Sequence, residues 1–173
     1  MAIIALTQRP RLTQNGDAVL DTLPLTLDDH DPRVTAAKAA EKQLYDFYGI
    51  SYTIRQIMLP RYGITVRITA TGEGDPVVIV PGNTGDGFPF IPLLPHLPGR
   101  RIFILNRPGG GLSEGMDHTT VNFHDFAVET VTTVFDALGF PMTAYRRSRA
   151  LLRTFAMTVI LASNNCRRLF PIR

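Results

Sequence analysis

Two short apolar runs, residues 77–80 and 102–105, restrict the folds open to this chain more than any other feature of its sequence. Each run holds four consecutive apolar residues, VVIV and IFIL, without a polar residue among them. Such strands are typical of a parallel sheet that is covered on both faces. Parallel neighbours require a crossover connection, and residues 88–97 lie in the right place to supply it. The sequence therefore predicts an α/β fold.

A helix is predicted ahead of these runs, over about residues 32–48. Asp31 is a favourable N-cap, Pro32 suits the first helical position, and Gly49 ends the periodic run. The apolar face expected for this helix consists of Val34, Ala37, Leu44 and Phe47.

Two further strands and a second helix complete the expected elements. Residues 51–59 and 62–71 are rich in β-branched and aromatic side chains, which predicts an antiparallel pair of strands. The second helix begins after Asn122, a favourable cap, and Gly139 ends it. Its expected buried stripe consists of Phe123, Phe126, Ala127, Val131, Val134 and Leu138.

Proline recurs at every third position of the crossover, at Pro89, Pro92, Pro95 and Pro98. This spacing is compatible with a polyproline II ligand for an aromatic groove. The residues between the prolines favour burial over the sheet instead, because they are apolar. They are Phe90, Ile91, Leu93, Leu94 and Leu97.

Charge divides the 173-residue chain near Asp136. Residues 1–136 hold all 15 acidic residues and 11 lysines and arginines, whereas residues 137–173 hold seven arginines and no acid. We therefore expect a flexible leader over residues 1–30, one globular domain over 31–140 and a divergent basic tail over 141–173. One cysteine excludes an internal disulfide, and no apolar run is long enough to span a membrane, so we expect a cytoplasmic protein.

Glycine-rich loops follow both apolar runs, over residues 81–87 and 106–113. Open α/β sheets build their sites at the carboxyl ends of their strands. Neither loop carries a dinucleotide fingerprint or a phosphate-loop Gly-Lys-Ser/Thr, so the sequence does not favour a nucleotide site or a nicotinamide-dependent dehydrogenase. Tight turns alone also explain the glycines of either loop.

Taken in order, these segments resemble the α/β-hydrolase superfamily of the AB hydrolase-1 type. The resemblance covers about residues 41–140. It rests on PGN at 81–83 in place of His-Gly-x, PLLPHL at 92–97, NRPGGGLS at 106–113 in place of Asp-x-x-Gly-x-Gly-x-Ser, and FDALG at 135–139. It implies a partial hydrolase fold, namely an N-terminal hairpin followed by parallel strands with crossovers in an incomplete sheet.

The resemblance also implies a mechanism: a nucleophile on a strand-to-helix elbow attacks an ester, amide or similar bond of a small-molecule substrate. No cofactor, metal or nucleic acid is implied. The backbone N–H of Asn83 is the expected oxyanion donor, although a plain turn residue is an equal alternative. The expected residues of the site loops are Gly82, Thr84, Gly85, Arg107, Gly109, Gly111 and Ser113.

The expected elbow is missing from the tail. Ser148 lies near the family's nucleophile position, but Arg146 and Ala150 replace the two glycines of G-x-S-x-G. All four histidines and all acids precede that position, whereas the family places its acid and histidine after it. We therefore expect a truncated or frameshifted hydrolase that is inactive as this chain, with an exposed sheet edge that favours aggregation.

Other interpretations remain open. A non-catalytic protein whose basic tail binds an anionic membrane surface or another partner is the main alternative, with residues 151–162 forming a short surface helix or replacing the lost strand. Asp86, Asp117 and His118 suggest a metal site or an acid/base pair only weakly. His30 and His118 are expected as turn residues, and His96 and His124 at a helix surface or the edge of the core. Oligomeric state is not predicted.

Overall fold

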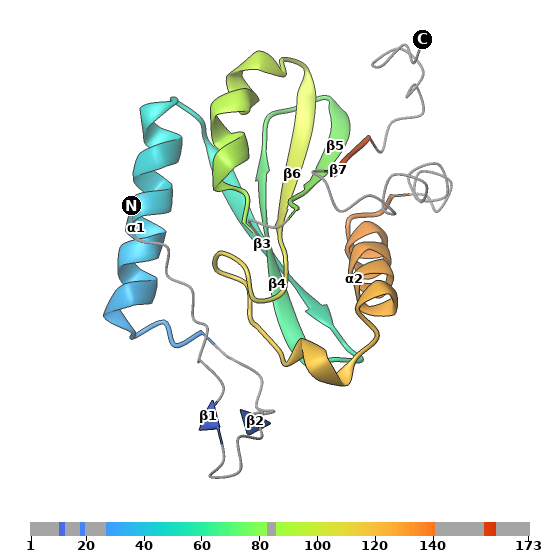
Figure 1. The fold of residues 1–173 in the computed structure, drawn as a ribbon. Coiled ribbons are helices and arrows are strands. Elements are labelled where there is room, and N and C mark those ends of the chain that lie inside the picture. The colour runs from blue at the N-terminus through green and yellow to red at the C-terminus, as the bar shows by residue number, and fades with distance from the viewer. Residues whose placement is uncertain (1–10, 13–17, 20–26, 83–85, 141–157, 162–173) are drawn as a thin grey trace.

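The computed structural model describes residues 11–12, 18–19, 27–82, 86–140 and 158–161. The chain forms seven strands, two α-helices and two 3₁₀ helices over these residues (Figure 1). In order they are β1 (Arg11–Leu12), β2 (Ala18–Val19), α1 (Pro32–Phe47), β3 (Tyr52–Leu59), β4 (Ile64–Thr71), β5 (Asp75–Val80), η1 (Phe88–His96), β6 (Arg100–Asn106), η2 (His118–Thr120), α2 (Phe123–Ala137) and β7 (Thr158–Leu161). None of the described helices is long and apolar enough to cross a membrane.

The main sheet has the order β3-β4-β6-β5-β7. β3 and β4 form the expected antiparallel hairpin, and β4 also pairs antiparallel with β6. β5 and β6 are parallel, with Val77 opposite Ile102, and η1 lies in the crossover between them. The α/β class, the hairpin and the parallel pair predicted from the sequence are therefore confirmed.

Strand β7 covers the edge of β5 that we expected to be exposed. It runs antiparallel to β5, with Val77 opposite Leu161 and Val80 opposite Thr158. The expectation of an open edge is wrong along this stretch, and residues 158–161 form the replacement strand rather than a surface helix. An unpaired edge offers a row of N–H and C=O groups, and an antiparallel strand satisfies them without a crossover helix.

The sheet separates two apolar cores, with α1 and α2 on opposite sides of it (Figure 1). Val78 and Val80 of β5 belong to the core that includes α2. Val77 and Ile79, which point the other way, belong to the core that includes η1 and Tyr45 of α1. This division confirms that β5 is covered on both faces, as its continuous apolar sequence predicted.

Helix α1 begins as predicted but buries a different stripe. The Asp31 side chain accepts a hydrogen bond from the backbone N–H of Arg33 at 2.7 Å, as an N-cap does. The buried residues are Val34, Glu41 and Tyr45, and Phe47 is 80% exposed. The prediction for Phe47 is wrong because a residue two positions after Tyr45 lies on the opposite side of a helix with 3.6 residues per turn.

Helix α2 also differs from its expected stripe. Asn122 caps it as predicted, accepting from the backbone N–H groups of His124 and Asp125 at 3.0 and 3.3 Å. Phe123 is exposed, and Thr130 and Phe135 are buried instead. Phe123 lies in the first turn, where its ring contacts that of His118 edge-on, with 6.0 Å between the centroids.

The proline-rich crossover packs over the sheet. η1 buries Phe90, Ile91 and Leu94 in the core that includes α1, which favours the packing interpretation over a polyproline ligand. Leu93 and Leu97 are exposed, contrary to expectation. With three residues per turn, Leu93 lies off the face that holds Ile91 and Leu94. Leu97 is the C-cap residue, where the backbone leaves the helical conformation.

Gly74 is expected to tolerate no side chain. Its φ is +110°, and a Cβ atom built there would lie 2.3 Å from the carbonyl oxygen of Gly99. We expect Gly74→Ala to lower the free energy of unfolding by about 2–3 kcal/mol in urea denaturation, because backbone strain adds to a clash with backbone. Gly49→Ala is the control: its φ is +65° with nothing within 4 Å, so about 1 kcal/mol is expected. Equal losses would contradict this account.

Candidate functional site

The parallel pairing of β5 and β6 brings the two glycine-rich loops to one edge of the sheet. Pro81 follows β5 directly, and Arg107 follows β6. Because both strands end at this edge, it is the place where an open α/β sheet forms a site. Gly82 lies there and is half-buried. Asn83, Thr84, Gly85 and Ser148 lie outside the described residues, so the oxyanion donor at Asn83 and a nucleophile at Ser148 stay predictions.

Asn106 joins the two loops. Its side chain is 2% exposed, and its Oδ1 atom accepts a hydrogen bond from the backbone N–H of Gly87 at 3.1 Å. Gly111 has a φ of +56°, and a Cβ there would lie 3.0 Å from Asn106 Nδ2 and 3.2 Å from Asp86 Cβ. Glycine at 111 therefore lets the second loop fold against Asn106. We did not predict this bridging role; its only signal was a polar residue directly after an apolar strand.

Ser113 fixes the far end of the second loop. The hydroxyl group donates to the backbone carbonyl oxygen of Asn106 at 2.6 Å and accepts from the backbone N–H of Arg67 at 2.8 Å. Glu114 continues this contact, because its backbone N–H donates to the carbonyl oxygen of Thr65 at 3.0 Å. The Ser113 side chain thus holds the loop against β4, and both of its hydrogen-bonding functions are used within the fold.

Ser113→Ala is expected to lower the free energy of unfolding by about 1–3 kcal/mol. The change leaves the buried N–H of Arg67 and the carbonyl oxygen of Asn106 without the hydroxyl group. Thermal and urea denaturation measure the loss. Ser51→Ala is the control, because Ser51 is exposed and its hydroxyl group forms no hydrogen bond with the described residues. It should lower the free energy of unfolding by under about 0.5 kcal/mol. A loss at Ser113 as small as at Ser51 would show that the hydroxyl does not anchor the loop.

Asp86 and the Asn106 amide lie on the η1 side of this edge. Burial raises the pKa of the Asp86 carboxyl, which also accepts a hydrogen bond from the backbone N–H of Phe88 at 3.3 Å. The Nδ2 group of Asn106 is buried and has no hydrogen-bond partner among the described residues. An amide donor thus lies beside a carboxyl group that protonates more readily than usual.

Arg107 continues the alternation of Phe103 and Leu105, which belong to the core on the α2 side, and His118 lies on that side because its ring contacts Phe126 of α2. Arg107 is half-buried, and burial lowers the pKa of its guanidinium group. His118 begins η2, and its ring centroid lies 5.2 Å from that of Phe126 on α2. Burial lowers the pKa of His118, Arg107 lowers it further, and Asp117 opposes this shift. Burial therefore favours the neutral form of the imidazole.

The described residues do not bring Asp86, Asp117 and His118 together as a metal site. No group of three or more His, Cys, Asp or Glu side chains in the described ranges is arranged to hold a metal ion. Asp117 instead caps η2, with its Oδ1 accepting from the backbone N–H and the hydroxyl of Thr119 at 2.8 and 2.7 Å. His118, expected as a turn residue, is half-buried in that short helix.

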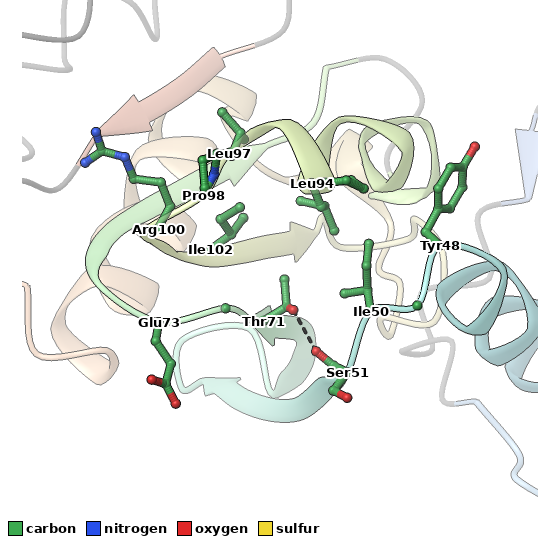
Figure 2. Close-up of a pocket in the computed structure, with 14 residues that line it drawn as sticks. Tyr48, Ile50, Ser51, Thr71, Glu73, Leu94, Leu97, Pro98, Arg100 and Ile102 are labelled. Atoms are coloured by element: carbon green, nitrogen blue, oxygen red, sulfur yellow. Dashed lines mark hydrogen bonds between the residues drawn. The ribbon is translucent and has the colours of Figure 1, made fainter.

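A pocket of about 470 Å³ lies at the other end of these strands, where β4 ends at Thr71 and β6 begins at Arg100 (Figure 2). Ile50, Leu94 and Ile102 form its apolar part, and the Thr71 hydroxyl donates to the Ser51 carbonyl oxygen at 2.6 Å beside it. None of the site residues predicted from the sequence lines it. No sequence signal pointed to this pocket, because its walls come from three separate segments, residues 48–51, 71–73 and 94–102.

Comparison of the chain with protein-family models, with curated proteins and with solved structures finds no match.

Proposed function

We propose that residues 31–140 form the amino-terminal part of an α/β-hydrolase domain. The observation that carries this proposal is the arrangement of the sheet: an antiparallel hairpin, then two parallel strands whose glycine-rich loops lie at one edge and are joined by Asn106. That edge is where a nucleophile and an oxyanion hole act on an acyl group. The resemblance of the sequence to this family supports the same assignment.

In this proposal the first loop is the oxyanion side of the site. The backbone N–H of Asn83 stabilises the negative charge that develops as a carbonyl carbon is attacked. The bond from Gly87 to Asn106 supports the loop at its far end. If the domain were completed, its substrate would be a small molecule with an ester, amide or similar bond, because the attack needs only an electrophilic carbonyl carbon or its equivalent.

We further propose that the chain as printed does not catalyse this reaction. In the sequence, Ser148 follows Arg146 and Arg147 and precedes Arg149, and both glycines of the elbow are missing. Those small residues permit the sharp turn that exposes the hydroxyl group, so Ser148 has no means to act as the activated nucleophile.

Covalent labelling tests this inactivity. The full chain is treated with a fluorophosphonate probe that reacts with activated serines, and hydrolysis of p-nitrophenyl butyrate is measured in parallel. We expect no labelling and no hydrolysis above that of the Ser148→Ala variant. Labelling that disappears in Ser148→Ala would contradict the inactivity, while leaving the assignment to the hydrolase fold in place.

A further inference from the structure

Arg107 differs from the other buried or half-buried arginines of the described chain. Arg67 and Arg100 each pair with a carboxylate, and Arg101 donates to a backbone carbonyl oxygen. Arg107 is half-buried, and its buried Nε atom has no hydrogen-bond partner among the described residues. No carboxylate among the described residues pairs with this guanidinium group. An unpaired cation that is partly removed from water is costly.

His118 carries a second unsatisfied group on the same side of the sheet. Its Nδ1 atom is buried and has no hydrogen-bond partner within the described part of the chain. The ring is held by edge contacts to Phe123 and Phe126, at 6.0 and 5.2 Å between centroids. A neutral imidazole donates a hydrogen bond from one of its two nitrogens. His118 is therefore a fixed ring with an unused donor or acceptor.

The turn that contains Gly109 connects Arg107 to the Nε2 side of the His118 ring, and the charge of Arg107 contributes to the lowered pKa of His118. Gly109 has a φ of +74° and lies two positions after Arg107, and a Cβ there would lie 3.9 Å from His118 Nε2. The turn is closed by two backbone bonds of 2.8 Å, from Gly109 to Glu114 and from Gly110 to Arg107. This hydrogen-bonded turn therefore lies between Arg107 and the His118 ring.

We propose that Arg107 and His118 form a binding site for a small oxyanion, a phosphate or a carboxylate group, on the α2 side of the edge where β5 and β6 end. A guanidinium group binds such oxyanions through paired N–H donors. The neighbouring imidazole adds a donor of its own. This inference rests on the two side chains and not on the proposed hydrolase activity.

An oxyanion fits this site better than a cation. The two carboxylates near the site in sequence have partners in the fold: Glu114 accepts a hydrogen bond from the backbone N–H of Thr65, and Asp117 Oδ1 accepts from Thr119. No carboxylate in the described part of the chain forms an ion pair with Arg107, and burial alone lowers its pKa. The positive charge of the site is therefore left for a ligand.

Histidine-ring NMR on the full chain tests the proposal. The ¹H–¹⁵N signals of His118 are followed while inorganic phosphate or sodium acetate is added at constant ionic strength. We expect a saturable shift with at least one of the two, and the more effective anion identifies the oxyanion class. Arg107→Gln should weaken the binding about tenfold or more. His118 signals that move with neither anion would overturn the proposal.

Arg55→Gln is the matched control, because it removes the same charge from an exposed position on β3. It should leave the His118 response unchanged, which separates this site from phosphate bound elsewhere by arginines. Arg107→Lys keeps the charge but loses the planar fork, so it should bind more weakly than the wild type even if Arg107→Gln does not fold. Equal affinity in the Arg107 and Arg55 variants would overturn the proposal.

Discussion

Replacing Glu41 with glutamine is expected to lower the free energy of unfolding by about 3–5 kcal/mol. Glu41 of α1 and Arg67 of β4 form a two-pronged ion pair with side chains only 3% and 5% exposed. Arg67 Nη1 donates to Glu41 Oε1 at 2.7 Å, and Nη2 donates to Oε2. Glutamine keeps the shape but leaves the guanidinium charge buried without its counter-charge.

Two further variants separate this effect from an ordinary surface change. Lys42→Gln removes one partner of the exposed Lys42–Asp46 pair on the same helix and should cost under about 0.5 kcal/mol. The double variant Glu41→Leu with Arg67→Met replaces both charges by apolar side chains. Its free energy of unfolding should lie within about 1 kcal/mol of the wild-type value. Urea denaturation followed by circular dichroism measures all three. A loss in Glu41→Gln no larger than in Lys42→Gln would contradict the buried-pair account.

Ile104→Ala is expected to cost about 2–5 kcal/mol, because it opens a cavity in the middle of the sheet. Ile104 lies on β6 between β4 and β5 and is fully buried. A Cβ on Gly87 would lie 2.3 Å from its Cγ2 atom, so the Ile104 side chain also supports the first loop. Its loss therefore weakens the core and the base of the candidate site together.

Urea denaturation again measures the effect, with Ile54→Ala as the control. Ile54 is half-exposed on the edge strand β3, and its truncation should cost under about 1 kcal/mol. Ile104→Val should fall between the two, at about 0.5–1.5 kcal/mol. If Ile104→Ala and Ile54→Ala destabilised the chain equally, β6 would not be the centre of the core.

The strands and helices were predictable because local patterns determine them. The apolar runs of β5 and β6 need two covered faces, and the caps Asp31 and Asn122 satisfy the free N–H groups of the helix starts in the way that their residue types favour. The buried stripe of α1 was not predictable from apolar residues alone. It includes Glu41, whose burial depends on Arg67, 26 residues away on β4.

The candidate site was predictable as a place but not as a set of contacts. The parallel strands brought the two loops to one edge, as expected. The bond from Gly87 to Asn106 joins residues 19 positions apart, and the burial of His118 depends on Phe126 of α2. Contacts of this kind arise from packing, for which a single sequence carries no periodic signal. The pairing of β7 with β5 was foreseen only as one of two alternatives.

We propose that residues 31–140 belong to a hydrolase domain whose elbow is replaced after residue 140. Sequencing the coding DNA through and beyond codon 140, and translating it in all three frames, tests this claim most directly. The account predicts that another frame encodes an apolar strand, then G-x-S-x-G, and later an acid and a histidine. If no frame encodes them, the basic tail is this protein's own sequence and the hydrolase assignment is contradicted.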